Sequence, residues 1–371
     1  MKVCTIVGTR PEIIKLSRVI PELDKHVHHV LLHTGQNYDY GLNGIFFKEL
    51  GLRLPDIEQT PVALDDCPNG PAARVGWMMC AIETSLKEEQ PDAVLILGDT
   101  NSAIAAAYAA KRQRLPIFHA EAGNRCFDER VPEEVNRRII DHIADINMPY
   151  TEHARRNLLA EGIAPDRIIK TGSPMCEVLG HYAAQIARSD ILDRLSLTGQ
   201  GYYVVSAHRE ENVDAADRLP ALTRVVDRLA KSAPVVWSVH PRTARRLPPA
   251  PPHNRVIMHE PFGFPDYMQL QINALCVISD SGTLTEEADT MQFPAVQIRQ
   301  AHERPEGMDA GTLIMSDLVE ERVLDAVRVA VEHGPVRDHI YDNVTACVSK
   351  KVVRTILSYT DYVRRNVWRQ A

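Results

Sequence analysis

Residues 94–100 read Val-Leu-Ile-Leu-Gly-Asp-Thr, a short apolar run that ends in a polar turn. A run of this length bounded by a turn is typical of a buried strand, and a helix-like stretch follows over 101–112. Four more apolar runs end in a charged or titratable residue: Glu121, His208, His240 and Asp280. In parallel α/β sheets the ligand crevice lies outside the carboxyl ends of the strands. The pattern therefore predicts an enzyme whose reactive side chains follow its strands.

Strand-like and helix-like segments alternate through the first half of the chain. The expected strands are 2–7, 29–33, 93–97 and 116–120. Helical spacing follows Pro11 and continues over 13–23. Further helices are expected at 41–50, 72–89, 101–112 and from Pro132. Repeated strand–loop–helix units predict a parallel sheet with helices on both faces.

The second half repeats this arrangement, with strands expected at 202–206, 234–239, 255–258, 275–279 and 294–298. The turn-rich segment 171–174 is an expected hinge between a first domain, 1–171, and a second, 172–354. The stretch from Lys351 to the end again has helical spacing. We therefore expect an α/β protein with two Rossmann-like domains that face each other across a cleft.

Composition narrows the class of protein without naming a reaction. At 371 residues the chain is long for one domain, and 44% hydrophobic and 25% charged residues are typical of globular proteins with sizeable cores. The formal net charge of -7 argues against a nucleic-acid partner. No segment approaches the roughly 18 apolar residues that span a bilayer, so no membrane partner is expected. Seven cysteines without a Cys-x-x-Cys pair predict a reduced, cytoplasmic protein.

Three motifs that would indicate a cofactor, a nucleotide or a metal are absent from the sequence. There is no Gly-x-Gly-x-x-Gly after the first strand and no Gly-x-x-x-x-Gly-Lys-Ser/Thr phosphate loop. There is also no His-Glu-x-x-His or comparable ligand spacing. We therefore expect neither a bound cofactor nor a metal.

The turn after the first strand carries cations beside a helix start. It reads Gly8-Thr9-Arg10-Pro11-Glu12, and Lys15 lies beyond it. Positive charge there opposes the helix dipole, whereas a bound anion would be favoured by the same cations and by the backbone N–H groups. The alternative is a solvated pair formed by Arg10 and Lys15.

A second turn with phosphate-binding character lies at 279–287. Ser281 and Gly282 offer backbone and hydroxyl donors at a helix start. Glu287 lies about one turn further on and suits the vicinal hydroxyls of a ribose. An ordinary Ser or Asp cap with acids in the first turn explains the same residues.

Acids gather after the expected strands of the first domain. Asp99 and Glu121 directly follow buried strands, and we expect both to act in acid/base chemistry, because burial and mutual repulsion separate carboxylate pKa values. The adjacent acids Glu133 and Glu134 lie at a helix start, and we interpret Glu134 as a solvated acid.

The second domain adds basic and titratable groups. His208 and Arg209 supply a titratable ring and a phosphate partner. His240 is either a third such group or a core-edge histidine satisfied by a backbone carbonyl. The segment 302–307 is a charged loop after a strand, which is either part of a site or a surface ion-pair network.

Seven short motifs in this order resemble the non-hydrolysing UDP-N-acetylglucosamine 2-epimerase family. They are Gly8-Thr9-Arg10-Pro11-Glu12, Gly98-Asp99-Thr100, Glu121-Ala122-Gly123, Pro132-Glu133-Glu134-x-Asn136-Arg137, His208-Arg209-Glu210, Asp280-Ser281-Gly282 and Glu303-Arg304-Pro305-Glu306. The resemblance runs nearly end to end. It implies the two-domain glycosyltransferase-B architecture, with the C-terminal helix 355–371 packing back on the first domain. We also expect a homodimer.

The resemblance implies a reaction without a redox cofactor. UDP is eliminated from a UDP-sugar to give a 2-acetamidoglycal and is then added back, with the proton delivered to the other face of C2. Positions that match catalytic residues of the family are Asp99, Glu121, Glu133 and His208. Expected substrate contacts are Arg10, Lys15, Arg209, His240, Ser281, Gly282, Glu287 and Arg304. Which acid removes the proton stays open.

Two segments depart from the usual family text, Asn124-Arg125-Cys126-Phe127-Asp128 and Asn37-Tyr38-Asp39-Tyr40. The second replaces a basic stretch that helps to bind an activating UDP-sugar in the bacterial parent enzyme, which puts that regulation in doubt here. Both segments resemble the branch that forms UDP-N-acetyl-L-fucosamine for capsule and O-antigen lipopolysaccharide.

The substrate expected from this resemblance is UDP-2-acetamido-2,6-dideoxy-L-talose. Cys126 and Phe127 either form an apolar wall for its methyl group or pack beneath their loop. Epimerisation of UDP-N-acetylglucosamine to UDP-N-acetylmannosamine is the alternative. A retaining glycosyltransferase of the same fold is a more distant one.

Overall fold

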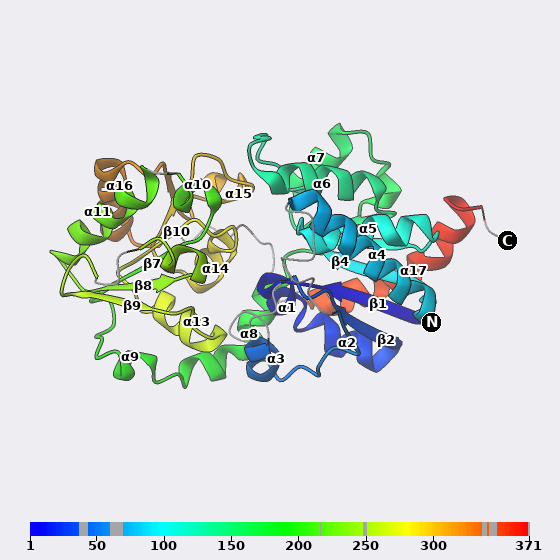
Figure 1. The fold of residues 1–371 in the computed structure, drawn as a ribbon, viewed down its shortest axis with the longest axis horizontal. Coiled ribbons are helices and arrows are strands. Elements are labelled where there is room, and N and C mark those ends of the chain that lie inside the picture. The colour runs from blue at the N-terminus through cyan, green and yellow to red at the C-terminus, as the bar shows by residue number, and fades with distance from the viewer. Residues whose placement is uncertain are drawn as a thin grey trace. The chain divides into compact units, whose positions relative to one another are not determined.

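The computed structural model describes residues 1–36, 44–59, 70–215, 217–247, 251–335, 340 and 347–369. The chain divides into two compact units (Figure 1): Met1–Val178 with Asn343–Ala371, and Leu179–Asp342. Each unit contains one six-stranded sheet, and every strand pairing in both sheets is parallel. The predicted α/β class with two wound parallel sheets is confirmed.

The first unit alternates strands with helices along most of its length. Its strands are β1 (Lys2–Val7), β2 (His28–His33), β3 (Ile57–Glu58), β4 (Ala93–Leu97), β5 (Ile117–Ala120) and β6 (Ile146–Met148). Its helices are α1 (Arg10–Leu16), α2 (Val19–His26), α3 (Gly44–Glu49), α4 (Pro71–Glu89), α5 (Asn101–Arg112), α6 (Pro132–Ile143), α7 (Glu152–Ala160) and α17 (Val348–Asn366), with a short 3-10 helix, Pro165–Arg167. The helix α8 (Met175–Ala187) begins in this unit and continues into the second.

The strand order of the first sheet is β3-β2-β1-β4-β5-β6. Successive residues of its strands point to opposite faces. Cys4 and Ile6 of β1 therefore join one apolar layer, whose helical side is supplied by α4, α5 and α6. Both faces of β1 and β4 are buried, which explains why these strands read as nearly continuous apolar runs.

The helix expected over 13–23 is two helices in the structure. The chain leaves α1 after Leu16 and re-enters helix at Val19. Pro21 is the cause, because proline lacks the N–H for an intrahelical bond and its ring collides with the carbonyl four residues earlier, here that of Ser17. The expectation of one helix was wrong, and helical periodicity alone did not reveal the break.

The last described helix, α17, belongs to the first unit and packs against α2. Arg364 of this helix pairs with Asp92, just before β4, at 2.7 Å. Lys111, at the end of α5, lies 4.8 Å from the Trp368 ring centroid just beyond α17. Both ends of the chain therefore lie in one unit (Figure 1).

The second unit repeats the alternation of strand and helix. Its strands are β7 (Tyr203–Ala207), β8 (Val235–Val239), β9 (Val256–His259), β10 (Cys276–Ser279), β11 (Ala295–Ile298) and β12 (Ile314–Ser316). Its helices are α9 (Ile191–Arg194), α10 (Glu210–Val213), α11 (Arg218–Ala230), α12 (Pro241–Ala244), α13 (Phe264–Ile272), α14 (Leu284–Met291), α15 (Glu306–Asp309) and α16 (Glu320–His333).

The second sheet has the order β12-β11-β10-β7-β8-β9. Numbered within the unit, this is the same order as in the first sheet. Val205 and Ile278 face a layer formed with α11 and α16, whereas Val204 and Val277 face a layer formed with α13 and α14. Among the described residues, no helix combines the length and apolar character that a membrane span requires.

Three strands of the structure were not expected from the sequence: β3, β6 and β12. Each lies at an outer position of its sheet and is two or three residues long. A segment this short cannot display an apolar run or an alternation, which are the signals that identify strands. The expected helix at 41–50 contains α3, and its residues 41–43 lie outside the described part of the chain.

His33 makes the stability of the first unit depend on pH. The side chain is fully buried at the end of β2 beside Phe47, and burial lowers the pKa of His33 to about 4. The native state therefore binds fewer protons at His33 than the unfolded state between about pH 4 and 6.5. The native state is therefore most stable with respect to His33 above pH 6.5, where the ring is neutral in both states, and it loses this stability as the pH falls. We expect that His33 alone lowers the free energy of unfolding by about 2 kcal/mol from pH 7 to pH 5.

Urea unfolding at the two pH values measures this effect. His33→Asn keeps an acceptor for the Gly35 N–H, which now donates to His33 Nδ1 at 3.2 Å, and removes the titratable ring. The variant should lose about 2 kcal/mol less on acidification than the parent. His28→Asn, at the exposed start of the same strand, is the control. An unchanged acid-induced loss in His33→Asn would show that other groups carry it.

Candidate active site

Each sheet has one point where the strand order reverses, between β1 and β4 in the first unit and between β7 and β10 in the second. Connections leave such a point in opposite directions, so a crevice opens at the carboxyl ends of the two strands. The motifs Gly8–Glu12 and Gly98–Thr100 follow β1 and β4. His208-Arg209 and Asp280–Gly282 follow β7 and β10. Each pair of motifs thus meets at one sheet edge of its own unit.

Glu12 is a buried carboxylate at the first of these points. It accepts hydrogen bonds from the backbone N–H groups of Gly8 at 2.8 Å and Thr9 at 2.7 Å. It also accepts a bond from the Thr100 hydroxyl at 2.7 Å. Burial raises the pKa of Glu12 to about 6, although all of these donors favour the charged form. The carboxylate joins the turn after β1 to the turn after β4.

Lys15 and Glu121, which were singled out for different roles, form one ion pair in the structure. Both side chains are largely buried, and Lys15 Nζ lies 5.8 Å from the Tyr150 ring centroid. Glu121 has a φ of +67°, a left-handed conformation that costs a residue other than glycine about 1–2 kcal/mol. Such strain at the end of a buried strand is typical of functional sites. Arg10 lies on the same helix as Lys15, 5.8 Å from the Phe46 ring centroid.

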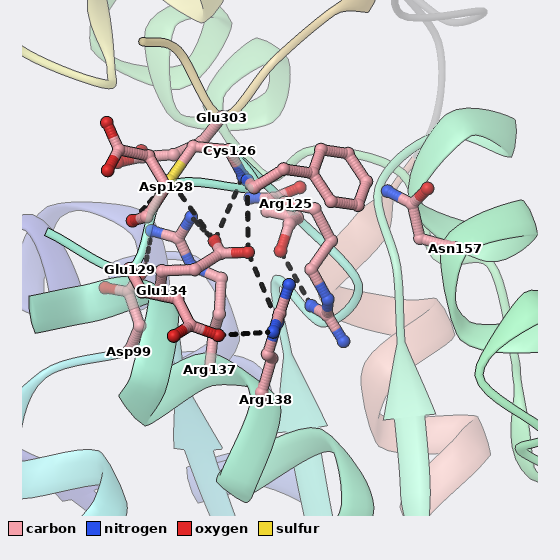
Figure 2. Close-up of polar contacts among 12 residues, drawn as sticks. Asp99, Arg125, Cys126, Asp128, Glu129, Glu134, Arg137, Arg138, Asn157 and Glu303 are labelled. Atoms are coloured by element: carbon pink, nitrogen blue, oxygen red, sulfur yellow. Dashed lines mark hydrogen bonds and ion pairs between the residues drawn. The ribbon is translucent and has the colours of Figure 1, made fainter. Parts of the chain in front are cut away.

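Asp99 belongs to a charged cluster at the start of α6 (Figure 2). Arg137 donates to Asp99 Oδ2 from Nη2 at 2.6 Å and from Nε at 3.0 Å. Its remaining nitrogen, Nη1, donates to Glu134 Oε2 at 3.0 Å. The Arg137 side chain is 3% exposed and that of Asp99 is 27% exposed. The guanidinium therefore fixes the position of a carboxylate that solvent or a ligand still reaches.

The interpretation of Glu134 as a solvated acid was wrong. Its side chain is fully buried, because it folds back under the loop before α6. The backbone N–H groups of Cys126 and Phe127 donate to it at 3.0 and 3.2 Å. Glu134 therefore holds this loop in place, while the neighbouring Glu133, in the same first turn of α6, is only half-buried.

The residues of the altered segment after Glu121 differ in burial and in their contacts. Arg125 is fully buried and pairs with Asp141 and Glu161 at 2.7 and 2.6 Å, so it supports the fold. Phe127 is 72% exposed, so it does not pack beneath the loop. The Cys126 thiol is half-buried, and burial raises its pKa to about 11. The other altered segment, Asn37-Tyr38-Asp39-Tyr40, lies outside the described residues.

In the second unit, Asp280 organises the turn that carries His208 and Arg209. This fully buried carboxylate accepts their backbone N–H groups at 3.0 and 2.9 Å. It also lies 3.2 Å from His208 Nδ1, which fixes the orientation of the imidazole. The His208 and His240 ring centroids are 5.9 Å apart. Two of the predicted residues are thereby brought together.

Charged residues surround the same sheet edge. Arg209 lies 3.6 Å from Glu303, which accepts a 3.0 Å bond from the buried Arg299. Gly282 lies beside this pair, since a Cβ added there would approach Glu303 Oε2 to 3.2 Å. The segment 302–307 is therefore not a surface ion-pair network, because Glu303, Arg304 and Glu306 are all buried.

Ser281 and Gly282 form the tight turn before α14. The Ser281 hydroxyl lies 3.0 Å from that of Thr283. Arg304 donates from Nε to the Gly282 carbonyl at 2.9 Å and lies 2.9 Å from Glu286. Arg304 is 4% exposed, so it holds the turn through a buried hydrogen bond to the Gly282 carbonyl.

Glu287 is also largely buried in the first turn of α14 and accepts a 3.0 Å hydrogen bond from the Gln271 amide. Like Arg304, it therefore has an internal partner in the structure.

Two residues that shape the site, Arg137 and Asp280, were given no individual role from the sequence. Arg137 was visible as the last residue of a motif, and Asp280 as the polar end of a strand. Within the described ranges, no three His, Cys, Asp or Glu side chains are grouped as a metal site would require.

A family model described as UDP-N-acetylglucosamine 2-epimerase matches residues 21–357 of the chain. The structure of a UDP-N-acetylglucosamine 2-epimerase from Rickettsia bellii is 48% identical, with a TM-score of 0.90 and full coverage of both chains. A Methanocaldococcus jannaschii 2-epimerase crystallised with UDP-GlcNAc and UDP is 31% identical, with a TM-score of 0.89, and the match covers 97% of this chain and 100% of that one.

A relative named for a different substrate is also similar to the chain. The Pseudomonas aeruginosa UDP-2,3-diacetamido-2,3-dideoxy-D-glucuronate 2-epimerase is 32% identical over 89% of this chain and 92% of its own length. Similarity at this level therefore spans more than one sugar.

Replacing Arg137 should destabilise the first unit. Arg137→Met leaves the buried Glu134 without its closest charged partner, and removing one member of a buried pair costs about 3 kcal/mol. Arg138→Met is the matched control, because Arg138 is 38% exposed and lies 3.4 Å from the same carboxylate. It should cost less than about 1 kcal/mol. Free energies of unfolding from urea titrations measure both, and equal losses would contradict this ranking.

Proposed function

Because the chain belongs to the UDP-N-acetylglucosamine 2-epimerase family and is a non-hydrolysing UDP-sugar 2-epimerase, we propose that it interconverts UDP-N-acetylglucosamine and UDP-N-acetylmannosamine. The observation that carries the proposal is the end-to-end similarity to a protein named for this activity, at 48% identity. The similarity to the Methanocaldococcus jannaschii 2-epimerase, whose crystal structure contains UDP-GlcNAc and UDP, supports the proposal further.

The substrate proposed here differs from the one first expected. The two altered segments favoured the L-fucosamine branch, whereas the relatives described above are named for UDP-N-acetylglucosamine or for a diacetamido glucuronate. The geometry gives the first expectation little support, since Arg125 is committed to an internal network. The 6-deoxy-L-talose substrate is therefore the competing hypothesis. A role in capsule or O-antigen synthesis, a homodimer and a cytoplasmic location stay predictions.

The reaction inverts a carbon whose proton is not adjacent to a carbonyl. The proposed steps break the C2–H and C1–O bonds, which forms a C1=C2 double bond and releases UDP. UDP then adds back to C1 while a proton returns to the opposite face of C2. One group must accept a proton and another must donate one, so the reaction needs at least two groups that titrate.

We assign the proton chemistry to Asp99, Glu121, Glu133 and His208. Arg137 and Lys15 pair with the side chains of Asp99 and Glu121, and Asp280 orients His208. The UDP contacts are assigned to Arg10, Lys15, Arg209, His240, Ser281, Gly282, Glu287 and Arg304. For Arg304 the support is indirect, because it reaches the Gly282 carbonyl from a buried position.

Deuterium incorporation tests the reaction and the substrate together. In deuterated water, UDP-N-acetylglucosamine should become deuterated at C2 and UDP-N-acetylmannosamine should accumulate, because the proton that returns comes from solvent-exchanged groups. The measurement is NMR or mass spectrometry of the recovered sugars. A glycosyltransferase would leave C2 protonated.

The same assay with UDP-2-acetamido-2,6-dideoxy-L-talose separates the two hypotheses. An apolar pocket rejects an added hydroxyl by only about 100-fold. Slow turnover of the less favoured sugar is therefore compatible with both hypotheses. A kcat/KM clearly higher for the 6-deoxy sugar would return the chain to the L-fucosamine branch.

Variants test the assigned roles. Asp99→Asn, Glu121→Gln, Glu133→Gln and His208→Asn should each lower kcat by about 100-fold or more, the usual scale of lost acid/base catalysis. Glu287→Ala should mainly raise KM, which indicates lost uniform binding. Steady-state kinetics measures both parameters.

Glu152→Gln is the control for the role assignments, since Glu152 lies in the first turn of α7 as Glu133 does in α6 but pairs with Lys170 at 46% exposure. It should leave kcat unchanged. Near-normal kcat in Glu121→Gln would move the proton chemistry to Asp99 and Glu133.

A further inference from the structure

A buried histidine reaches the peptide from which Asp99 projects. His119 of β5 is fully buried, and its Nε2 lies 2.8 Å from the Gly98 carbonyl oxygen. A carbonyl oxygen only accepts hydrogen bonds, so Nε2 carries a proton and donates it. Gly98 also donates its N–H to the Ala120 carbonyl at 2.9 Å. The peptide before Asp99 is therefore held from β5 on both sides.

The second nitrogen of this ring faces a buried aspartate. His119 Nδ1 lies 2.9 Å from Asp141 Oδ1. The other oxygen of Asp141 accepts from the Gly123 backbone N–H at 3.1 Å and from Arg125 Nη1 at 2.7 Å. Burial alone would raise the pKa of Asp141, but His119 and Arg125 hold that pKa below its ordinary value. Asp141 is therefore a carboxylate, and it holds the peptide two residues after Glu121.

The turn at Glu121 needs such support. Glu121 and Gly123 have φ values of +67° and +85°, so two of three consecutive residues are left-handed. A Cβ at Gly123 would collide with the Ala154 carbonyl, and the Asn157 amide donates to the Gly123 carbonyl at 3.0 Å. A non-glycine residue in this conformation persists only where its surroundings fix it.

We propose that His119 and Asp141 are positioning residues, which keep the carboxylates of Asp99 and Glu121 at a fixed separation by holding the Gly98 and Gly123 peptides. The inference rests on the proposed function, since it concerns proton transfer at C2 of the same substrate. Both side chains are fully buried, so they act through the two turns. A misplacement of about 1 Å in such a site costs about 100-fold in rate.

Asp145 offers a matched control, because it contacts β5 at the end of the strand opposite to Glu121. It is fully buried, as Asp141 is. It pairs with Lys111 at 2.6 Å and accepts the backbone N–H of Ile117 at 3.0 Å. Ile117 is the first residue of β5, at the amino end of the strand. Loss of either carboxylate should therefore destabilise the unit, but only Asp141 contacts a turn that carries a proposed catalytic acid.

The first measurement compares kcat, KM and the thermal midpoint of Asp141→Asn and Asp145→Asn. Asp141→Asn should lower kcat by about 10–100-fold and leave KM within about threefold. Asp145→Asn should lower the thermal midpoint but keep kcat within about twofold of the parent, because it is remote from the acids. Equal kcat values in the two variants, both assayed well below their midpoints, would overturn the proposal.

Substitutions of His119 separate its two contacts. His119→Gln retains a donor that reaches the Gly98 carbonyl but loses the contact with Asp141, whereas His119→Leu loses both. We expect kcat to be highest in the parent protein, lower in His119→Gln and lowest in His119→Leu. If Asp141→Asn fails to fold, this series decides the question, and equal kcat in the parent and His119→Leu would contradict the inference.

Amide hydrogen exchange of the resting protein supplies a readout that needs no turnover. Peptides that contain Gly98 and Gly123 should exchange faster in Asp141→Asn and His119→Leu but not in Asp145→Asn. Unchanged exchange would overturn the positioning role even if activity fell. An inactive parent protein would instead defeat the proposed function, while the exchange data would still show whether the pair holds the turns.

Discussion

At each point where the strand order reverses, a buried carboxylate accepts the backbone N–H groups of the turn. The geometry of both sites depends on these hydrogen bonds. Parallel strands that send their connections in opposite directions leave backbone N–H groups at their carboxyl ends without sheet partners. In the first unit Glu12 accepts the N–H groups of Gly8 and Thr9. In the second unit Asp280 accepts those of His208 and Arg209. Buried N–H groups need such partners, and each carboxylate also reaches a side chain beyond its own turn.

The buried arginines follow the same logic at larger scale. Arg125, Arg137, Arg299 and Arg304 are each nearly inaccessible, and each contacts at least two acceptors. A planar guanidinium satisfies several acceptors at fixed angles, which suits loops that must hold one conformation. Replacing such networks by apolar residues often leaves stability unchanged or improves it. We therefore expect a whole network to define the positions of the turns more than it adds stability, whereas removal of one member, such as Arg137, leaves its buried partner uncompensated.

The central strands and their polar ends could be predicted because both signals are local. Short, mainly apolar runs that end just before Asp99 and Glu121 are visible without any knowledge of the fold. The short outer strands β6 and β12 carry too few residues for a pattern, and Pro21 divided a helix that periodicity had joined. Sequence resemblance supplied the reaction class, and it favoured a sugar that the described relatives do not support.

The partners of the site residues could not be predicted, because they come from distant parts of the chain. Arg137 and Asp99 are 38 positions apart, and His208 and Asp280 are 72 apart. Only the packing of helices on sheets brings such pairs within bonding distance. Glu134 shows the limit most clearly: an acid in a first helical turn is usually solvated, but here the preceding loop folds over it.

The position of α17 has a consequence for how the protein is made. The second unit is one uninterrupted segment, residues 179–342, whereas the first unit includes residues on both sides of it. Chains leave the ribosome from their N-terminus, and domains generally fold as units during synthesis. The second unit can therefore complete its sheet while the surface of α2 that α17 covers is still bare. In that interval α2 lacks the cover of α17, whose Val352, Val353 and Ile356 are buried in the finished protein.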